Sequence, residues 1–299
     1  MLDTFEAAGQ FWRGNVHGHS TNSDGRLSPE EACAAYREQG YDFVCLSDHF
    51  RPKFNFPVSD TRGYRANGFT TILGAEVHAP VTTRGVEWHI LAVGLPADFP
   101  ATRETETGVE LAQRCADAGA FVAIAHPAWY NLEFEDALAL EAAHAVEVYN
   151  HTSAVHTSRG DSAAMWDALL SAGRRITGIA VDDSHWKPGT PDAFGGWVMV
   201  KAEENDPDAL LAALKAGRFY ATQGPEISAL RRVDDKIVLR CSPATQVFAV
   251  GPVATATHVT GSALTRATLP LEKFEGSWCR VVVRDAMGRQ AWTNPLWLD

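Results

Sequence analysis

The stretch YDFVCLSDH, residues 41–49, contains the pattern that decides the fold. Its apolar run, residues 41–46, has the length and flanks of a buried β-strand. The run stops at three polar residues, and His49 lies one or two positions beyond the expected end of the strand. A buried strand followed at once by polar side chains is typical of an α/β protein whose functional residues gather at strand ends.

The segment before this strand predicts a helix over residues 28–40. Ser28 is a suitable N-cap, Pro29 takes the first helical position, and Glu31 completes a capping box three residues after the cap. Gly40 then ends the segment. A helix that leads directly into a buried strand is one unit of a β/α fold.

The same unit recurs along the first 220 residues. Because polar residues follow six or seven strand ends, we expect a parallel β/α barrel with its site on the C-terminal face. A doubly wound open sheet is the alternative, but its crevice draws on only two or three strand ends. The expected strands are residues 71–75, 88–93, 120–125, 145–149 and 176–181, with helices near residues 107–118, 135–143, 161–172 and 207–216.

Histidines and acidic residues lie in or just after these strands. The pair His17 and His19 has i, i+2 spacing, which on a strand puts both rings on one face. Imidazole and carboxylate together suit zinc, manganese and iron, and a carboxylate can bridge two ions. The predicted metal ligands are His17, His19, Asp24, His49, Glu76, His89, His126, Asp183 and His185.

Composition narrows the function classes. The net charge of −11 argues against tight binding to nucleic acid or to an anionic membrane. Residues 1–14 lack an apolar signal region and no run approaches 18 apolar residues, so we expect a cytoplasmic protein without a membrane span. Five widely spaced cysteines, with no C-x-x-C motif, predict free buried thiols.

The composition changes after Gly217, since ten of the eleven histidines precede it. The remainder predicts a small antiparallel sandwich that is docked on the barrel, with residues 223–225 as the junction. The expected domains are therefore residues 1–222 and 223–299. The short β-rich runs behind this prediction are residues 236–241, 246–250, 254–259, 263–269, 278–284 and 290–292.

Eight motifs in order resemble the polymerase and histidinol phosphatase (PHP) superfamily. They are NVHGHS (residues 15–20), DG (24–25), SDH (47–49), Glu76, WHILAVG (88–94), AHP (125–127), EVYN (147–150) and DSH (183–185). The segments GRFYAT (217–222) and AWTNP (291–295) are similar to its carbaryl-hydrolase-like branch. The resemblance covers the chain to about residue 222.

This resemblance implies a distorted seven-stranded β/α barrel, which is TIM-like, and two or three divalent ions of Mn, Fe or Zn. It implies one ion at His17, His19, Glu76 and Asp183, a second at Glu76, His89 and His126, and a third at Asp24, His49 and His185. The D-x-H spacing favours Asp183 over Asp182 as the ligand. His89 lies inside a strand, so a core histidine without metal is the alternative reading.

The favoured function is that of a metal-dependent phosphoesterase acting on a small phosphorylated metabolite or nucleotide. Paired ions lower the pKa of a bound water toward ~7, so no covalent intermediate is required. A carbamate or carboxyl ester hydrolase with an aryl leaving group is the second possibility, suggested by the branch resemblance and by Trp129 and Trp186. A non-catalytic metal-binding module is the third, although the complete ligand set counts against it.

The other candidate site residues are predicted from their positions near the ligands or after strand ends. His151 follows a strand end and is the candidate acid–base residue, and Asp182 is expected beside the ligands as a positioning or turn residue. His78 faces either the site or solvent, whereas His144 and His156 are interpreted as surface residues. Candidates for contact with an anionic small-molecule substrate are Arg26, Lys53, Arg84, Arg159 and Lys187.

Overall fold

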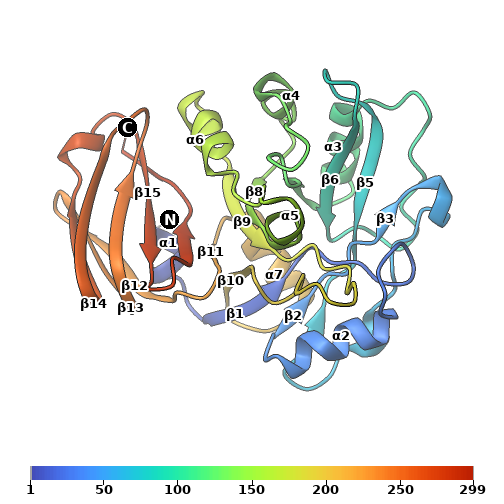
Figure 1. Ribbon diagram of the computed structural model, residues 1–299, viewed down its shortest axis with the longest axis horizontal. Helices are drawn as coiled ribbons and strands as arrows, with labels where there is room; N and C mark the ends of the chain where they lie inside the picture. The colour runs from blue at the N-terminus through green and yellow to red at the C-terminus, as the bar shows by residue number, and fades with distance from the viewer. Residues whose placement is uncertain (1, 299) are drawn as a thin grey trace.

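The computed structural model describes residues 2–298 and arranges them as helices around two β-sheets (Figure 1). One sheet has six strands, in the order β3 (His49–Phe50), β5 (Gly74–Val81), β6 (Glu87–Val93), β7 (Phe121–Ile124), β8 (Ala145–Asn150) and β9 (Thr177–Val181). The other has eleven strands, and its main path runs β12 (Ile227–Val233), β13 (Lys236–Val250), β15 (Trp278–Arg284), β16 (Gln290–Thr293), β11 (Phe219–Thr222), β10 (Trp197–Ala202), β1 (Gln10–Asn15), β2 (Phe43–Val44) and β4 (Thr70–Thr71). Off this path, β14 (Ala256–Pro270) pairs with β13 and β17 (Leu296–Trp297) pairs with β15.

Across residues 2–298 the strands form these two sheets rather than the single closed barrel that the sequence predicts. One reason is that β1 pairs antiparallel with β10, which carries the sheet away toward the C-terminal strands. Another is that β6 runs antiparallel to both β5 and β7, because residues 82–86 are too few for a crossover helix. The mixed α/β class is as expected.

The two sheets meet where their strands end. His19 donates its backbone N–H to Ser184 O at 2.8 Å, and Glu76 donates its backbone N–H to Ser47 O at 2.9 Å. Gly18 and Ser184 form a parallel bridge. The loops that follow strands of both sheets are therefore held side by side, which places their polar side chains together.

The α-helices within residues 2–298 are α1 (Leu2–Glu6), α2 (Pro29–Glu38), α3 (Gly108–Asp117), α4 (Phe134–Ala139), α5 (His151–Thr157), α6 (Ala163–Ser171) and α7 (Pro207–Lys215), with 3-10 turns at Pro52–Phe54, Arg62–Tyr64 and Glu272–Phe274. Five of these seven α-helices lie close to predicted positions, whereas α1 and α5 were not predicted. The capping box of Ser28 and Glu31 is present at the start of α2, as predicted. Thr107 and Glu110 form a second one at α3.

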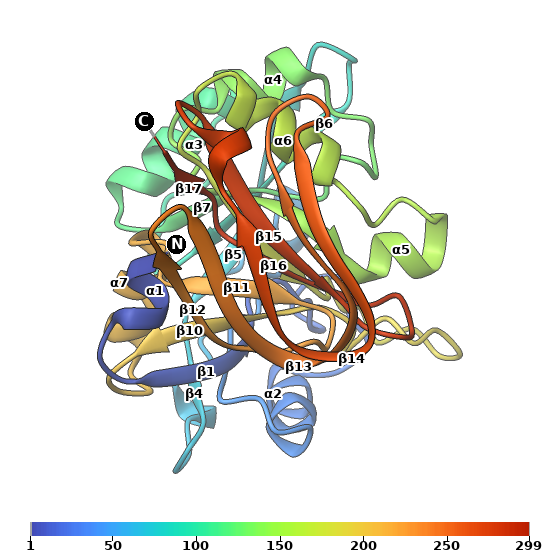
Figure 2. The same ribbon diagram turned by 90° about the vertical axis from the view of Figure 1, so that its left-hand side faces the viewer.

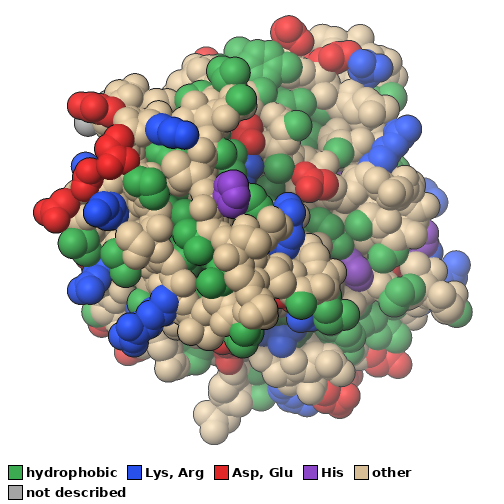
Figure 3. All heavy atoms as spheres, turned by 60° about the vertical axis from the view of Figure 1, so that its left-hand side comes forward, with side chains coloured by type: hydrophobic (Ala, Val, Ile, Leu, Met, Phe, Trp, Pro, Cys, Tyr) green, Lys and Arg blue, Asp and Glu red, His purple; other side chains and the backbone are tan. Residues whose placement is uncertain are grey.

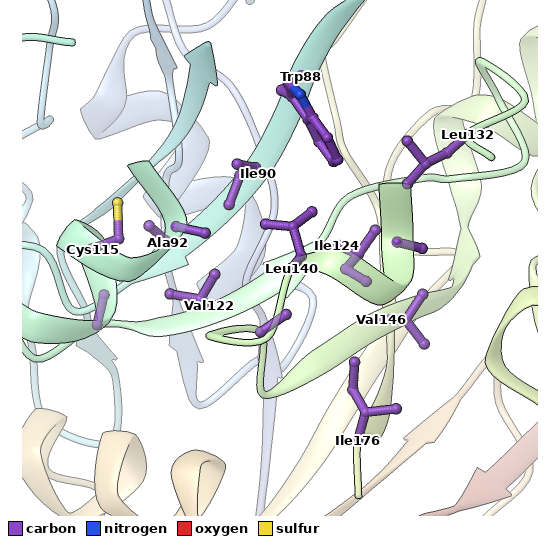
Figure 4. Packing of buried hydrophobic residues seen from close by; sticks show 14 of the residues in the cluster. Trp88, Ile90, Ala92, Cys115, Val122, Ile124, Leu132, Leu140, Val146 and Ile176 are labelled. Carbon is purple, nitrogen blue, oxygen red and sulfur yellow. The ribbon is translucent and has the colours of Figure 1, made fainter. Parts of the chain in front are cut away.

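A large apolar core fills the space between the six-stranded sheet and the helices packed on it. Figure 4 shows Trp88 and Ile90 of β6, Val122 and Ile124 of β7, and Cys115 of α3 directed into this layer. All five are at most 5% exposed. Their burial holds the strands rigidly, so that the strand ends present functional groups from a fixed scaffold.

The C-terminal strands continue the eleven-stranded sheet instead of standing apart from it. Residues 236–250 form one strand where two were expected, and β14 likewise merges two predicted runs. Figure 2 shows β13, β14 and β15 as long, curved neighbours. The sheet passes from β16 to β11 through pairs such as Tyr220 with Thr293, so backbone hydrogen bonds cross the predicted boundary at residue 222.

Side chains also join the two parts of the chain. Arg280 of β15 donates to both carboxylate oxygens of Asp167 in α6, at 2.7 and 2.9 Å. Trp278 and Trp292 belong to the same apolar cluster as Trp166 of α6. The C-terminal strands thus complete the core beneath β8 and β9.

The exterior matches the acidic but mixed composition. Figure 3 shows acidic and basic side chains interspersed with apolar and other residues on the face that it presents. Within residues 2–298, no helix is long and apolar enough to cross a membrane.

A chain ending at Thr222 tests whether residues 1–222 fold alone. Such a truncation leaves the backbone groups of β11 unpaired on the side of β16 and uncovers Trp166 and Ala221. We expect the fragment to lack a cooperative urea transition by circular dichroism and to elute as aggregates in gel filtration, with the full chain as control. A fragment that unfolds cooperatively as a monomer would show instead that the boundary at residue 222 separates two autonomous domains.

Candidate metal centre

All nine predicted ligands converge where the two sheets meet. They come from the loops after β1, β7 and β9, from the turn at Asp24, and from β3, β5 and β6. Their nitrogen and oxygen atoms fall into overlapping groups of three or four, within each of which every atom lies within 4.8 Å of the others. The spacing argument for His17 and His19 agrees with this geometry, since both belong to a group with Glu76.

Glu76 lies at the middle of the cluster and is fully buried. Its Oε1 atom is 2.6 Å from His89 Nδ1 and 3.1 Å from His126 Nε2. Its Oε2 atom is 2.6 Å from His49 Nδ1 and 3.6 Å from His17 Nε2. One carboxylate therefore contacts histidines from several segments, the arrangement that a bridging ligand requires.

The strand register explains why His89 reaches Glu76 from inside a strand. In the antiparallel pair of β5 and β6, His78 is opposite His89 and Glu76 is opposite Leu91. Glu76 and His89 are thus diagonal neighbours on one face of the hairpin. The alternative reading of His89 as a plain core histidine is not favoured by this contact with a buried carboxylate.

Asp183 forms the second acidic point of the cluster. Its Oδ1 atom is 2.8 Å from His19 Nε2, 3.3 Å from His17 Nε2 and 3.9 Å from His185 Nδ1. Its backbone has a φ of 57°, in the left-handed region, and its N–H donates to His17 O. The left-handed turn directs the carboxylate back toward the β1 loop, at a cost that the surrounding contacts offset.

Asp24 is the most accessible of the predicted ligands. Its side chain is 42% exposed, and its Oδ1 atom lies 3.5 Å from His49 Nε2 and 3.4 Å from His185 Nε2. It stands on a turn that follows His19, whereas the other ligands lie within strands or in the loops directly after them.

Asp48 anchors the turn that carries Asp24, a role that the sequence does not predict. Its carboxylate is fully buried and accepts hydrogen bonds from the backbone N–H of Ser20 at 2.7 Å and from the hydroxyls of Ser20, Ser23 and Ser59. Four hydrogen bonds compensate the burial of this charge without a cation. The turn is therefore tied to the start of β3.

The donor set fits divalent metal ions. In the described part of the chain, His17 Nε2 and His126 Nδ1 are buried and form no hydrogen bond. Unpartnered buried nitrogen and oxygen atoms are costly unless something binds them. Imidazole and carboxylate donors in groups of three or four meet the requirement of zinc, manganese or iron.

Glu147 contacts two of the ligand segments, a role that the sequence does not predict. Its Oε1 atom is 2.6 Å from His17 Nδ1, and its Oε2 atom accepts from the backbone N–H of His126 at 2.8 Å. A carboxylate on the far nitrogen of a ligand histidine fixes its tautomer and ring orientation. The available signal was an acidic residue in the middle of the buried strand at residues 145–149.

Burial and neighbouring charges shift the pKa values of the cluster. Burial lowers the pKa of the His17 imidazole, but the charges of Asp183 and Glu147 outweigh this and raise it well above its ordinary value. Burial and two adjacent imidazoles lower the pKa of His19 to about 4. Burial disfavours the charged form of Glu76, yet the surrounding histidines hold its pKa well below the usual value. Without metal, Glu76 is an anion and His17 carries a proton at neutral pH.

Seven of the nine predicted ligands, all except His17 and His19, form the floor of a cavity of about 380 Å³. Trp129 contributes to its wall, is 38% exposed, and places its ring 5.2 Å from the ring of His126 and 5.5 Å from that of His89. Arg51, which the sequence did not single out, is ion-paired with Glu87. The lining residues that are not predicted ligands are Arg51, Trp129, Thr152, Ser153, His156 and Lys187.

Two predicted catalytic residues lie beside the cavity but are not among its lining residues. His151 bonds through Nδ1 to the Tyr149 hydroxyl at 2.9 Å and through Nε2 to Pro191 O at 2.8 Å. Asp182 is fully buried and accepts from the Tyr36 hydroxyl and from backbone N–H groups of residues 194–196. Its contacts are those of a positioning residue that holds the 194–196 loop.

The five predicted cationic candidates have different contacts. Lys187 lines the cavity, whereas Arg84 pairs with Glu133 and Lys53 lies over the ring of Phe54. Arg159 donates to Trp129 O, so it supports the wall of the cavity. The backbone N–H of Arg26 donates a hydrogen bond to His185 O.

The remaining candidates have mainly structural contacts. Trp186 donates its indole N–H to His19 O at 3.1 Å and packs on Tyr36. His78 is buried and its Nε2 atom lies 2.9 Å from His49 Nδ1, so of the two readings it faces the site. The five cysteines, Cys33, Cys45, Cys115, Cys241 and Cys279, are free and buried as predicted.

Three solved structures are similar to this chain, and one of them superposes with a TM-score above 0.5. A two-domain protein from Bacteroides vulgatus, which contains a PHP-like metal-dependent phosphoesterase by prediction, superposes with a TM-score of 0.53 at 17% identity over 99% of this chain and 96% of its own. A candidate metal-dependent phosphoesterase from Bifidobacterium adolescentis gives 0.44 at 18% identity, over 60% of this chain and 90% of its own. An amidohydrolase from Chromobacterium violaceum with bound sulfate and no metal gives 0.47 at 14%, over 59% and 88%.

No protein family profile matches the sequence, and no curated protein sequence matches it either. At 17% identity the likeness to the B. vulgatus protein supports the fold, over nearly the whole of both chains. The carbaryl-hydrolase-like branch is not confirmed by these neighbours.

Replacing Glu76 tests its central position. We expect Glu76→Gln to lose about two metal equivalents where His17→Ala loses about one, because Glu76 belongs both to the group with His17 and His19 and to the group with His89 and His126. Metal content after reconstitution and desalting, measured by plasma mass spectrometry, gives the result. His258→Gln, on β14, is the matched control and should keep the full complement. Full metal content in Glu76→Gln would contradict a bridging role.

Metal uptake should release protons at pH 7. The raised pKa of His17 means that the metal-free protein holds a proton there, and a ligand nitrogen must lose it to bind a cation. Affinity for Mn²⁺ should therefore fall as the pH is lowered, and the calorimetric enthalpy should change with the ionisation enthalpy of the buffer. Glu147→Gln removes one charge that raises this pKa, so it should release fewer protons. An enthalpy that is the same in every buffer would refute this account.

Proposed function

We propose that this protein is a metal-dependent phosphoesterase that acts on a small phosphorylated metabolite or nucleotide at a di- or trinuclear site. The observation that carries the proposal is the convergence of nine histidine, glutamate and aspartate side chains, seven of which line one cavity. Its volume of about 380 Å³ is at the lower end of the range for small-molecule pockets.

Three groups of residues would hold the ions. His17, His19, Glu76 and Asp183 would form one position, Glu76, His89 and His126 a second, and Asp24, His49 and His185 a third. Divalent ions in such a set supply Lewis acidity toward water and toward phosphoryl oxygens, together with positive charge where negative charge develops. The two buried imidazole nitrogens that form no hydrogen bond, His17 Nε2 and His126 Nδ1, support this occupancy.

The chain's own residues would bind and orient the phosphoester. Lys187 and Arg51 line the cavity above the ligands and supply cationic side chains for an anionic substrate. Glu147 holds the ring of His17 through Nδ1, which keeps Nε2 directed toward Glu76 and Asp183. The exposed face of Trp129 gives the substrate an apolar wall.

A carbamate or carboxyl ester hydrolase is the second candidate. The observation that favours it is the same Trp129 ring, which stands within 5.5 Å of two ligand histidine rings and could pack against an aryl leaving group. The two cationic side chains in the cavity favour the phosphoester. A non-catalytic module does not account for a cavity that opens directly onto the ligand set.

Phosphate release tests the proposal. Manganese-loaded protein should release phosphate from at least one member of a panel of mononucleotides, sugar phosphates and aryl phosphates, and a chelator should abolish the release until Mn²⁺ is restored. His17→Ala is the blank, because it removes one of the predicted metal ligands. If no member of the panel releases phosphate while the same preparation hydrolyses aryl carbamates or esters, the second candidate function is supported instead.

A further inference from the structure

Helix α5 presents one face to the cavity and another away from it. Thr152, Ser153 and His156 line the cavity, as expected for residues spaced i, i+1 and i+4 near one side of a helix. His151 precedes His156 by five residues, which is a rotation of about 140° around the axis. The ring of His151 is held away by Tyr149 and Pro191, and a Cβ atom at Gly195 would lie only 2.2 Å from it.

The position of α5 is fixed relative to the metal ligands. Thr152 donates its hydroxyl to Asp183 O at 2.7 Å and its backbone N–H to Asp182 O at 2.9 Å. Just past the end of the helix, Arg159 donates to Trp129 O at 3.3 Å. The helix is therefore tied at its start to the turn that carries Asp183 and near its end to the opposite wall. Figure 1 shows α5 beside the ends of β8 and β9.

His156 differs from the histidines of the floor. Those rings contact buried carboxylates, whereas His156 is exposed and its ring has no hydrogen bond or ion pair recorded within residues 2–298. It belongs to the cavity lining but to none of the groups of candidate ligands described above. Its ring is thus free to meet a bound substrate rather than an ion.

We propose that His156 is the general acid that protonates the leaving group, an inference that rests on the proposed phosphoesterase function. When the phosphorus–oxygen bond to the leaving group breaks, its electron pair goes to the leaving oxygen, and the proton of the His156 imidazolium forms the new O–H bond. The attacking water supplies the oxygen that phosphorus gains, and its proton passes to solvent. Neutral His156 then takes a proton from solvent, which restores the starting state.

Arg51 and Lys187 are the other basic side chains that line the cavity, and Arg51 is ion-paired with Glu87. A lysine ammonium is a compact point charge that suits attraction of the phosphate. An imidazole is the side chain that most often serves as a general acid, since it can both give and regain a proton in each cycle. Lys187 and His156 are therefore assigned different roles, which substrates of different leaving-group acidity can separate.

The experiment compares an alkyl phosphate with p-nitrophenyl phosphate. His156→Asn should lower kcat for the alkyl phosphate by roughly 10²- to 10⁴-fold, the usual contribution of a general acid. It should hardly change kcat for p-nitrophenyl phosphate, because that phenolate leaves without a proton. His151→Asn, one helix turn away with its ring outside the cavity, is the matched control and should show no such selectivity. Lys187→Gln should raise KM for both substrates alike.

Two measurements without turnover accompany the kinetics. Metal content of His156→Asn and its calorimetric affinity for phenylphosphonate should equal those of the unaltered protein, since phenylphosphonate has no leaving oxygen to protonate. A loss of either would assign His156 to metal or substrate binding and overturn the proposal. Equal losses of kcat on both substrates would overturn it too. An unaltered protein that hydrolyses neither ester would instead sink the proposed function, and this inference with it.

Discussion

The structure depends on the burial of one carboxylate, Glu76, among imidazole rings. A buried anion is tolerated only where positive charge or hydrogen-bond donors surround it. Glu76 meets this condition through His49, His89 and His126, which arrive from three different elements. The β3 loop, the β5–β6 hairpin and the loop after β7 must therefore all end at one place, and their packing against α3, α4 and α6 keeps them there.

A second layer of carboxylates shapes this centre without belonging to it. Glu147 holds His17 and the backbone of His126, and Asp48 holds the turn before Asp24. Asp182 fastens the 194–196 loop. Each of these acids lies within or just after a buried strand and is satisfied by neutral donors or by a histidine. Because the strands hold these acids in place, the acids in turn fix the positions of the ligands on the loops.

Much of the site could be predicted because it follows from local rules. Strand ends carry the polar residues, and the i, i+2 pair at His17 and His19 faces one way as the strand period requires. The path of the sheets could not be predicted in the same way. Whether β6 runs parallel or antiparallel depends on the short connection at residues 82–86, and the continuity of β16 with β11 depends on pairing across 70 residues.

The two histidines of α5 are another example of what the sequence predicts and what it does not. The sequence favours His151 because it follows a strand end, yet the helix begins at that residue and turns its ring toward Tyr149. Five residues on, His156 reaches the cavity. The expectation that functional residues follow strand ends does not predict this position. The direction of a side chain on a short helix depends on where the helix starts and on which loop packs against it.

Solvent access is unequal across the ligand set. Asp24 is 42% exposed at its side chain, whereas Glu76, His17 and His19 are fully buried. An ion near Asp24 would exchange with bulk cations far faster than ions held by the buried ligands, because only its carboxylate can swing away without breaking the core. The metal content of the protein would therefore report the free cation concentration around it, and the occupancy of the outer position would follow the supply of metal while the inner positions stayed filled.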